Sequence, residues 1–133
     1  MKEILLSKFV ESYNEVVSNM QERYFNDNVF CICNYVNLQI KIEKLSEIIN
    51  KSLELKTQNI SSIYRYVLFT AYLIENYTNL QIDVDMYKTY DLLRSSGLLN
   101  KILSLVPENE INESQKFVDM ILHDILYFKE ENE

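Results

Sequence analysis

The chain has very few of the residues that make tight turns. Its 133 residues include one glycine, one proline and no tryptophan. Sandwiches and barrels of β-strands need glycine and proline at many turns, so this scarcity argues against both. Apolar residues make up 47% of the chain, which supports a hydrophobic core and excludes a disordered tail. We therefore predict an all-α fold, a compact single-domain bundle of about five or six helices over residues 1–133.

Histidine and cysteine are also scarce, and this limits the chemistry available. The one histidine, His123, stands before Asp124 as in HD-type metal-dependent phosphohydrolases, but their metal pair needs several histidines and carboxylates. Cys31 and Cys33 are too close in sequence for a mutual disulfide, and with one distant histidine they do not complete a zinc site. Nucleophilic catalysis would need a base beside a cysteine or serine. We expect reduced, buried structural cysteines and a histidine at the surface or at the edge of the core.

Signatures of nucleotide or calcium binding are missing as well. A single glycine cannot build a glycine-rich phosphate loop. Asp83, Asp85 and Asp91 offer carboxylates near one another, but they lack the spacing and the central glycine of a calcium loop. We expect no catalytic residue, no cofactor and no metal, and therefore a protein that is not an enzyme.

The charge balance is acidic, with 20 acidic and 13 basic residues and a formal net charge of −7. The densest basic run begins at Lys41 and is interleaved with Glu43 and Glu47 at helical spacing, which is typical of a solvated face. Direct nucleic-acid binding needs clustered basic residues and is not expected. The longest apolar run is far shorter than the roughly 18 residues of a membrane span, and no leader is expected, so we predict a cytoplasmic protein.

Helical periodicity predicts most of the elements. A first amphipathic helix of about six turns is predicted over Ile4–Tyr24. A second helix is predicted with a buried stripe of Leu38, Ile42, Leu45, Ile49 and Leu53. A third, over Ile63–Tyr77, is apolar nearly all round and is expected at the centre of the bundle. A last helix is predicted to bury Phe117, Val118, Ile121, Leu122, Ile125 and Phe128.

The segment Val29–Val36 is ambiguous. Its apolar residues fit either a buried extended stretch or a tight turn of helix, and periodicity cannot decide over so short a run. Because an isolated strand would have no partner, we favour an ordered linker that threads the core.

The glycine and the proline lie close together, and both are explained by helix ends. Asp85 can cap a short helix that ends near Ser95. Gly97 then supplies the left-handed residue that follows a helix, and Leu98–Val106 forms a short helical piece. Pro107 suits the first turn of the last helix, where Glu108 and Glu110 favour the helix dipole.

Several motifs in the second half of the chain carry a resemblance. They are Tyr77-Thr78-Asn79-Leu80, Tyr90-Asp91-Leu92-Leu93, Ser96-Gly97-Leu98-Leu99 and Val106-Pro107-Glu108 with Glu110, and upstream Tyr35-Val36 leading to Ile42-Glu43-Lys44. From about Val29 to the end the chain resembles a loose family of small phage and prophage proteins of low-GC Gram-positive bacteria. Such proteins are usually encoded among virion structural genes. The resemblance implies a place in phage particle assembly and supplies no catalytic residues.

Tyrosine is abundant, with ten in the chain. Tyrosine combines a large apolar area with a polar tip and so suits protein interfaces, although AT-rich codon usage alone would also supply tyrosine to a core. We predict an interaction surface at Tyr87, Tyr90 and Arg94. The expected partners are other proteins, either phage structural proteins or a host protein, and a homo-oligomer is an option.

The function predicted from these observations is non-enzymatic protein–protein interaction in phage particle assembly, as a minor structural component or an assembly helper. The alternative is a small acidic inhibitor of a host defence or nucleic-acid-binding protein. A continuous negative stripe on the surface would favour the inhibitor, whereas the acidic residues of the sequence are dispersed. The predicted location is the host cytoplasm, with the virion as an option.

Overall fold

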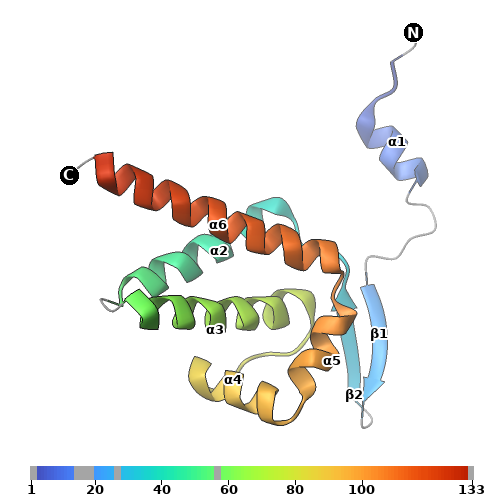
Figure 1. Ribbon diagram of the computed structural model, residues 1–133. Helices are drawn as coiled ribbons and strands as arrows, with labels where there is room; N and C mark the ends of the chain where they lie inside the picture. The colour runs from blue at the N-terminus through green and yellow to red at the C-terminus, as the bar shows by residue number, and fades with distance from the viewer. Residues whose placement is uncertain (1–2, 14–19, 26–27, 56–57, 132–133) are drawn as a thin grey trace.

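Helices dominate the structure, a computed structural model that describes residues 3–13, 20–25, 28–55 and 58–131 (Figure 1). In chain order the elements are α1 (Leu6–Tyr13), β1 (Met20–Phe25), β2 (Asn28–Cys33), α2 (Leu38–Leu53), α3 (Gln58–Tyr77), α4 (Met86–Ser95), α5 (Leu98–Leu105) and α6 (Glu108–Glu131). The predicted all-α bundle is confirmed within this part of the chain. It carries a two-stranded antiparallel hairpin that the sequence did not predict.

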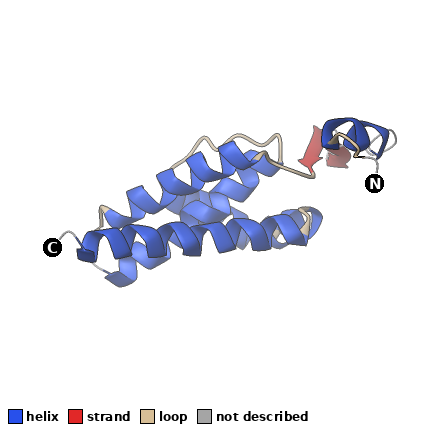
Figure 2. Ribbon diagram, turned by 90° about the horizontal axis from the view of Figure 1, so that it is seen from above, coloured by secondary structure: helices blue, strands red, loops and turns tan. Residues whose placement is uncertain are grey.

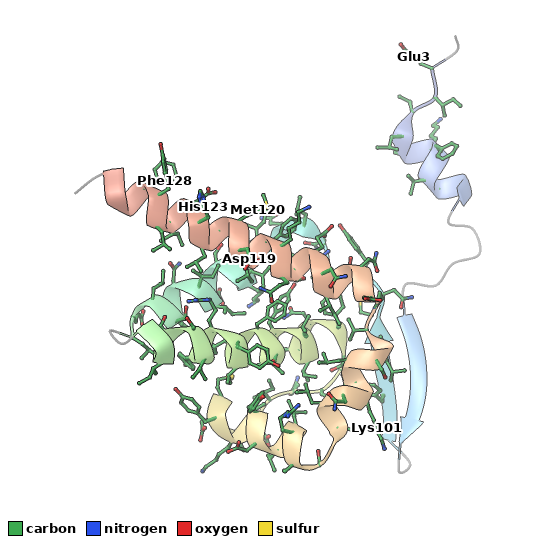
Figure 3. The ribbon with its side chains drawn as sticks, in the orientation of Figure 1. Glu3, Lys101, Asp119, Met120, His123 and Phe128 are labelled. Carbon is green, nitrogen blue, oxygen red and sulfur yellow. The ribbon has the colours of Figure 1, made fainter. Side chains whose placement is uncertain are left out.

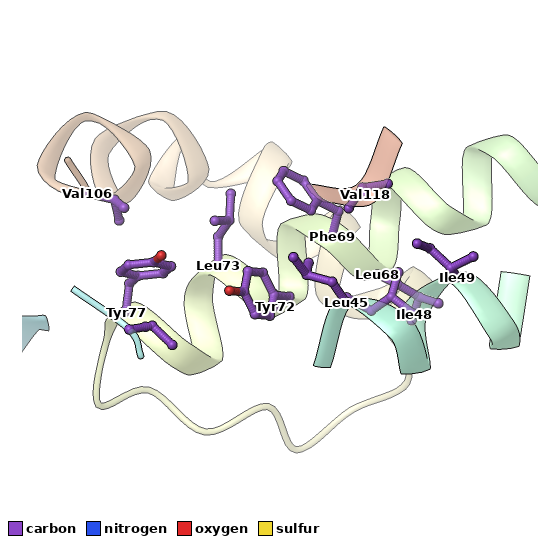
Figure 4. Packing of buried hydrophobic residues seen from close by; sticks show 11 residues of the cluster. Leu45, Ile48, Ile49, Leu68, Phe69, Tyr72, Leu73, Tyr77, Val106 and Val118 are labelled. Atoms are coloured by element: carbon purple, nitrogen blue, oxygen red, sulfur yellow. The ribbon is translucent and has the colours of Figure 1, made fainter. Parts of the chain in front are cut away.

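The main core forms where α2 and α6 pack against each other and α2 packs on α3. The face of α3 that begins at Leu68 carries apolar side chains at helical spacing, and these meet Leu45 and Ile49 of α2 and Val118 of α6 (Figure 4). The predicted central position of α3 is confirmed for its second half, where the residues from Val67 to Ile74 are all buried. Its first half is more exposed.

A second, smaller core lies where α3, α4 and α5 meet. Its buried members are Ile74, Leu93, Leu99 and Ile102, and Phe30 of β2 packs against them. The hairpin therefore joins the bundle at this end, and Ile32 also forms an isolated antiparallel bridge with Thr78 just after α3.

The predicted helix ends around the glycine and the proline are confirmed. The Asp85 side chain caps α4 by accepting a hydrogen bond from the backbone N–H of Lys88 at 3.0 Å. Gly97 has φ 74°, the left-handed conformation that a side chain disfavours, and its N–H donates to the carbonyl of Arg94. Pro107 precedes the first residue of α6. This corner turns the chain from α4 through α5 into α6.

The prediction of one helix over Ile4–Tyr24 is wrong in its second half. The helix α1 ends at Tyr13, residues 14–19 lie outside the described part, and Met20–Phe25 is the strand β1. Apolar residues at three- and four-residue intervals also occur in a strand that pairs, so tertiary pairing overrides the periodic pattern here.

The ambiguous segment Val29–Val36 is extended rather than a linker as far as Cys33. Strand β2 pairs with β1 in the register Gln21↔Ile32 and Arg23↔Phe30. The strand has a partner because Met20–Phe25 is extended rather than helical. Ile32 and Val36 are buried, as the expectation of a segment in the core required.

The predicted buried stripes of α2 and α6 are partly wrong. Helix α2 buries Lys41, Leu45, Ile48, Ile49 and Ser52. Leu38, Ile42 and Leu53 of the predicted stripe are exposed instead. On α6, Val118 is buried and its apolar neighbours are half-buried, whereas Phe128 is 60% exposed. The face of α2 that meets the core is rotated from the predicted one. It includes Lys41, whose Nζ pairs with Glu110 of α6.

Helix α1 lies beyond the hairpin and apart from the bundle in both views (Figures 1 and 2). Every residue from Glu3 to Glu11 is exposed. Exposed apolar side chains include those of Ile4, Leu5, Leu6, Phe9 and Val10. None of these five side chains belongs to either core cluster of the bundle. We call residues 3–13 the N-terminal arm.

Candidate interaction surfaces

The predicted interaction residues Tyr87, Tyr90 and Arg94 lie on one face of α4. Their spacing of three and four residues places them one above another along the helix. Tyr87 is 54% exposed, Tyr90 is half-buried against the smaller core, and Arg94 is exposed in the last turn, where a positive charge favours the helix dipole. The three side chains are thus brought together, and their role in binding stays a prediction.

Two tyrosines of α3 support this face. The rings of Tyr64 and Tyr87 stack with centroids 5.6 Å apart, and the ring of Tyr66 meets that of Tyr90 edge-on at 6.0 Å. Offset-stacked and edge-on pairs of this kind are favourable arrangements of aromatic rings. The rings of Tyr87 and Tyr90 therefore already help to hold α4 on α3. Less of their aromatic area is left for a partner than the sequence suggests.

The cysteines and the histidine lie away from this face. Cys31 and Cys33 are free thiols on β2 and are half-buried rather than buried as expected. The Sγ of Cys33 donates to the carbonyl oxygen of Tyr35 at 2.8 Å. His123 is on the exposed side of α6, as expected, and its Nδ1 lies 3.9 Å from the Asp124 carboxylate (Figure 3).

A buried polar cluster, which the sequence did not predict, joins α2, α3 and α6. Lys41 of α2 is completely buried, and its Nζ lies 2.9 Å from Oε1 of Glu110 and 2.8 Å from Oε1 of Glu113. The Oη of Tyr77 donates to the same Glu110 oxygen at 2.9 Å, and the Val36 N–H donates to it at 3.3 Å. One carboxylate oxygen therefore ties together three helices and the segment that follows β2.

The opposite charges and hydrogen bonds of this cluster offset the cost of burying it. Burial alone would lower the pKa of Lys41, but hydrogen bonds and charge from Glu113 and Glu110 outweigh it, so the pKa lies above its usual 10.5. Burial raises the pKa of Tyr77 strongly, and its bond to Glu110 adds to the shift. Lys41 therefore stays charged and Tyr77 stays protonated at neutral pH.

Two further hydroxyl groups sit in the same interior. Burial raises the pKa of Tyr72, whose ring meets that of Tyr77 edge-on at 6.3 Å, and the nearby Ser114 hydroxyl opposes the shift. The hydroxyls of Tyr72 and Ser114 make no hydrogen bond of good geometry with the described residues. Lys41, Tyr77 and Ser114 are completely buried, whereas Glu113 is 46% exposed at the edge of the cluster. The hydrogen bonds and ion pairs of the cluster therefore fix how the helices meet.

The surface hollows bordered by α6 are open grooves rather than enclosed pockets. The one between α2 and α6 has a volume of about 400 Å³ and is lined by Leu38, Ile42, Phe117, Met120, Ile121 and Asp124. We call it the α2/α6 groove. Its lining is apolar apart from one carboxylate. Met120 points away from α3 on the outer side of α6 (Figure 3).

The described residues provide neither a metal site nor a membrane span. No three histidine, cysteine or acidic side chains among them gather closely enough to hold a metal ion. None of the helices that can be described is both long and apolar enough to cross a bilayer.

Comparison with known proteins gives no further guidance on the function of these surfaces. Neither a protein-family model, nor a curated protein, nor a solved structure matches the chain. The class that the fold defines is therefore an all-α bundle with an apolar N-terminal arm, and its function has to be argued from its own surfaces.

Proposed function

We propose that this chain is a non-enzymatic protein–protein interaction protein of phage particle assembly, either a minor structural component or an assembly helper. The observation that carries the proposal is the apolar surface left exposed on the arm and the bundle. Leu6 and Phe9 of the arm are 76% and 54% exposed, and Met120 of α6 is 54% exposed. Exposed apolar side chains that gather on one helix face are typical of sites of association.

The total surface area supports the same proposal. The chain exposes 10145 Å², whereas a compact monomer of 15.9 kDa is expected to expose about 7,400 Å². The difference is larger than the roughly 800 Å² that each partner buries in a standard protein–protein interface. A partner protein is the simplest way to cover so much surface.

The assembly context rests on the resemblance to phage and prophage proteins. The motifs that carry it include the left-handed Gly97, the Tyr77 hydroxyl and the Glu110 oxygen that joins the helices. Such motifs specify a fold and leave the surface to specify a partner. We place the protein in the host cytoplasm during assembly and, where it stays bound, in the virion.

Affinity capture tests the proposal directly. Tagged protein is recovered from cells in which the phage is being produced, and bound proteins are identified by mass spectrometry. Virion structural proteins are expected among the partners, and Tyr87→Ala is expected to weaken their recovery more than Lys88→Ala, which changes another face of the same helix. Recovery of a host nuclease without virion proteins would contradict assembly and favour an inhibitor.

A further inference from the structure

We propose that the N-terminal arm is an exchange arm. Resting on the interaction function proposed above, this inference names the first partner: a second copy of the chain, whose α2/α6 groove receives the apolar face of α1. In a symmetric pair each copy gives one arm and fills one groove. The argument rests on the arm, the groove, the surface area and the charges, taken in turn.

The arm has the pattern of a helix that binds in a groove. Leu5, Leu6, Phe9 and Val10 fall on one side of α1 because they are spaced by one, three and four residues. Ser7, Lys8 and Glu11 fall on the other side. The backbone N–H of Phe9 donates to the carbonyl of Leu5 at 3.0 Å, which brings Leu5 into the first turn. The side chains of Leu5, Leu6, Phe9 and Val10 are between 40% and 76% exposed, so much of this apolar side is accessible to a partner.

The α2/α6 groove is incomplete in the complementary way. Leu38 and Ile42, one turn apart on α2, are about half exposed although their spacing predicts a core stripe. Met120 stands opposite them on α6, and Phe117 and Ile121 lie half-buried beneath. A third helix laid between α2 and α6 would cover these side chains. Helix-in-groove binding uses anchors spaced in the way that the arm provides.

The surface area favours a second copy as the occupant. The chain exposes 10145 Å², about 2,800 Å² more than a compact monomer of its mass would expose. Reciprocal exchange would cover two arms and two grooves in one complex. Obligate homodimers typically bury roughly 2,000–5,000 Å², and exchange draws on exposed apolar side chains of both the arm and the groove in each copy.

The charges permit this pairing in spite of the net charge of −7. The arm carries Glu3, Lys8 and Glu11, so it adds little net charge, and its Lys8 and Glu11 lie on the side away from the apolar stripe. The groove contains one charged residue, Asp124, whose side chain is 73% exposed at the rim. The contact is therefore apolar at its centre, and the acidic residues of the two copies stay in solvent.

Matched aspartate substitutions test the two halves of the contact. Phe9→Asp on the arm and Met120→Asp in the groove are each expected to convert a dimer into a monomer, measured by light scattering or sedimentation over a concentration range. The expected increase in the dissociation constant is roughly 100-fold or more. Ser7→Asp on the polar side of α1 and Leu92→Asp on α4 add the same charge outside the contact, and are expected to stay dimeric.

Circular dichroism shows whether each variant keeps its helices, and all four substitutions are at exposed positions. A monomeric parent chain would overturn the proposal. So would a dimer that survives both Phe9→Asp and Met120→Asp, since its interface would lie elsewhere.

Cross-linking identifies the occupant of the groove. A photoreactive amino acid is placed at position 9, and unlabelled chains are mixed with chains that carry heavy nitrogen. Cross-links from position 9 to peptides of α2 or α6 in mixed-isotope pairs are expected. Cross-links only within one chain would show that the arm closes on its own groove, and cross-links to other elements would show a different dimer; both contradict exchange.

Failure of this inference can be distinguished from failure of the proposed function. The dimer is measured on the purified chain, whereas assembly is measured by the capture of virion proteins. A monomer that still captures virion proteins would refute the exchange arm alone. A dimer that captures none would refute the assembly role alone.

Discussion

Two helices of this chain carry similar apolar stripes and have opposite surroundings. The second half of α3 buries nearly every side chain from Val67 to Tyr77, whereas α1 exposes every side chain from Leu6 to Glu11. Both stripes read as core in the sequence, because periodicity reports that a face is apolar and does not report what covers it. The apolar side chains of α3 form the core of the bundle, whereas those of α1 from Leu6 to Val10 are exposed.

The polar residues show the same contrast in reverse. Lys41 and Glu110 are buried in the bundle and make specific bonds, while the charged residues of the arm are solvated. A buried ion pair contributes little net stability compared with apolar residues, but removal of one partner is costly. The cluster therefore fixes how α2, α3 and α6 meet. The comparison between bundle and arm can be tested by substitutions in each.

Lys41→Met is expected to have the largest effect. The substitution leaves the Glu110 carboxylate buried with only its bonds from Tyr77 and Val36, so the free energy of unfolding should fall by about 3–5 kcal/mol. Urea denaturation measures the change. The exposed Lys44→Met is the control and should change stability by less than about 0.5 kcal/mol. If the two variants were equally stable, the buried ion pair of Lys41 with Glu110 would not hold α2 on α6.

A matched pair of leucine truncations compares the core with the arm. Leu45→Ala removes a completely buried side chain beside α3 and should destabilise by about 2–5 kcal/mol. Leu6→Ala in the arm should change the stability of the dissociated chain by less than about 0.5 kcal/mol. Denaturation at low protein concentration measures both. A loss of several kcal/mol for Leu6→Ala would mean that the arm belongs to the core of its own chain.

Tyr77→Phe gives a smaller, pH-dependent effect. Loss of a hydrogen bond to a carboxylate should cost about 1.5–3 kcal/mol at neutral pH. The folded chain raises the pKa of Tyr77 above its usual 10.0 and that of Lys41 above 10.5. Both groups therefore contribute stability that is fully present below about pH 10 and is lost as the pH rises further, because only the unfolded chain then releases these protons readily.

The measurement for this prediction is the free energy of unfolding between neutral and strongly alkaline pH. Tyr77→Phe should lose less stability across the alkaline range than the parent chain, because one of the two contributions is gone. Tyr87→Phe, on the exposed face of α4, should follow the parent. An unchanged alkaline slope in Tyr77→Phe would contradict the burial of that hydroxyl.

Much of the bundle could be predicted from the sequence because local signals decide its helix ends. The Asp85 cap, the left-handed Gly97 and Pro107 before α6 each act through the backbone of neighbouring residues. The strand pair could not be predicted in the same way. The pairing of β1 with β2 depends on partners that meet only in the fold, and the first strand also has an apolar pattern that suits a helix.

The sites were harder to predict for a related reason. The surface at Tyr87, Tyr90 and Arg94 follows from helical spacing, so the sequence predicts that these residues share a face. The ion pair of Lys41 with Glu110 joins residues far apart in the chain, and lysine in a run of alternating charges is usually solvated. The buried face of α2 is therefore predicted only in part: Leu45 and Ile49 are buried as expected, whereas Leu38 and Ile42 are exposed. The completely buried Lys41 is the member that the sequence does not predict.

The concentration dependence of thermal unfolding tests the central claim most directly, because association between copies stabilises the folded state by mass action. The account predicts that the Tm of the parent chain rises with protein concentration and that the Tm of Phe9→Asp does not. A Tm that is independent of concentration for both chains would contradict the claim that the apolar face of α1 serves association between copies.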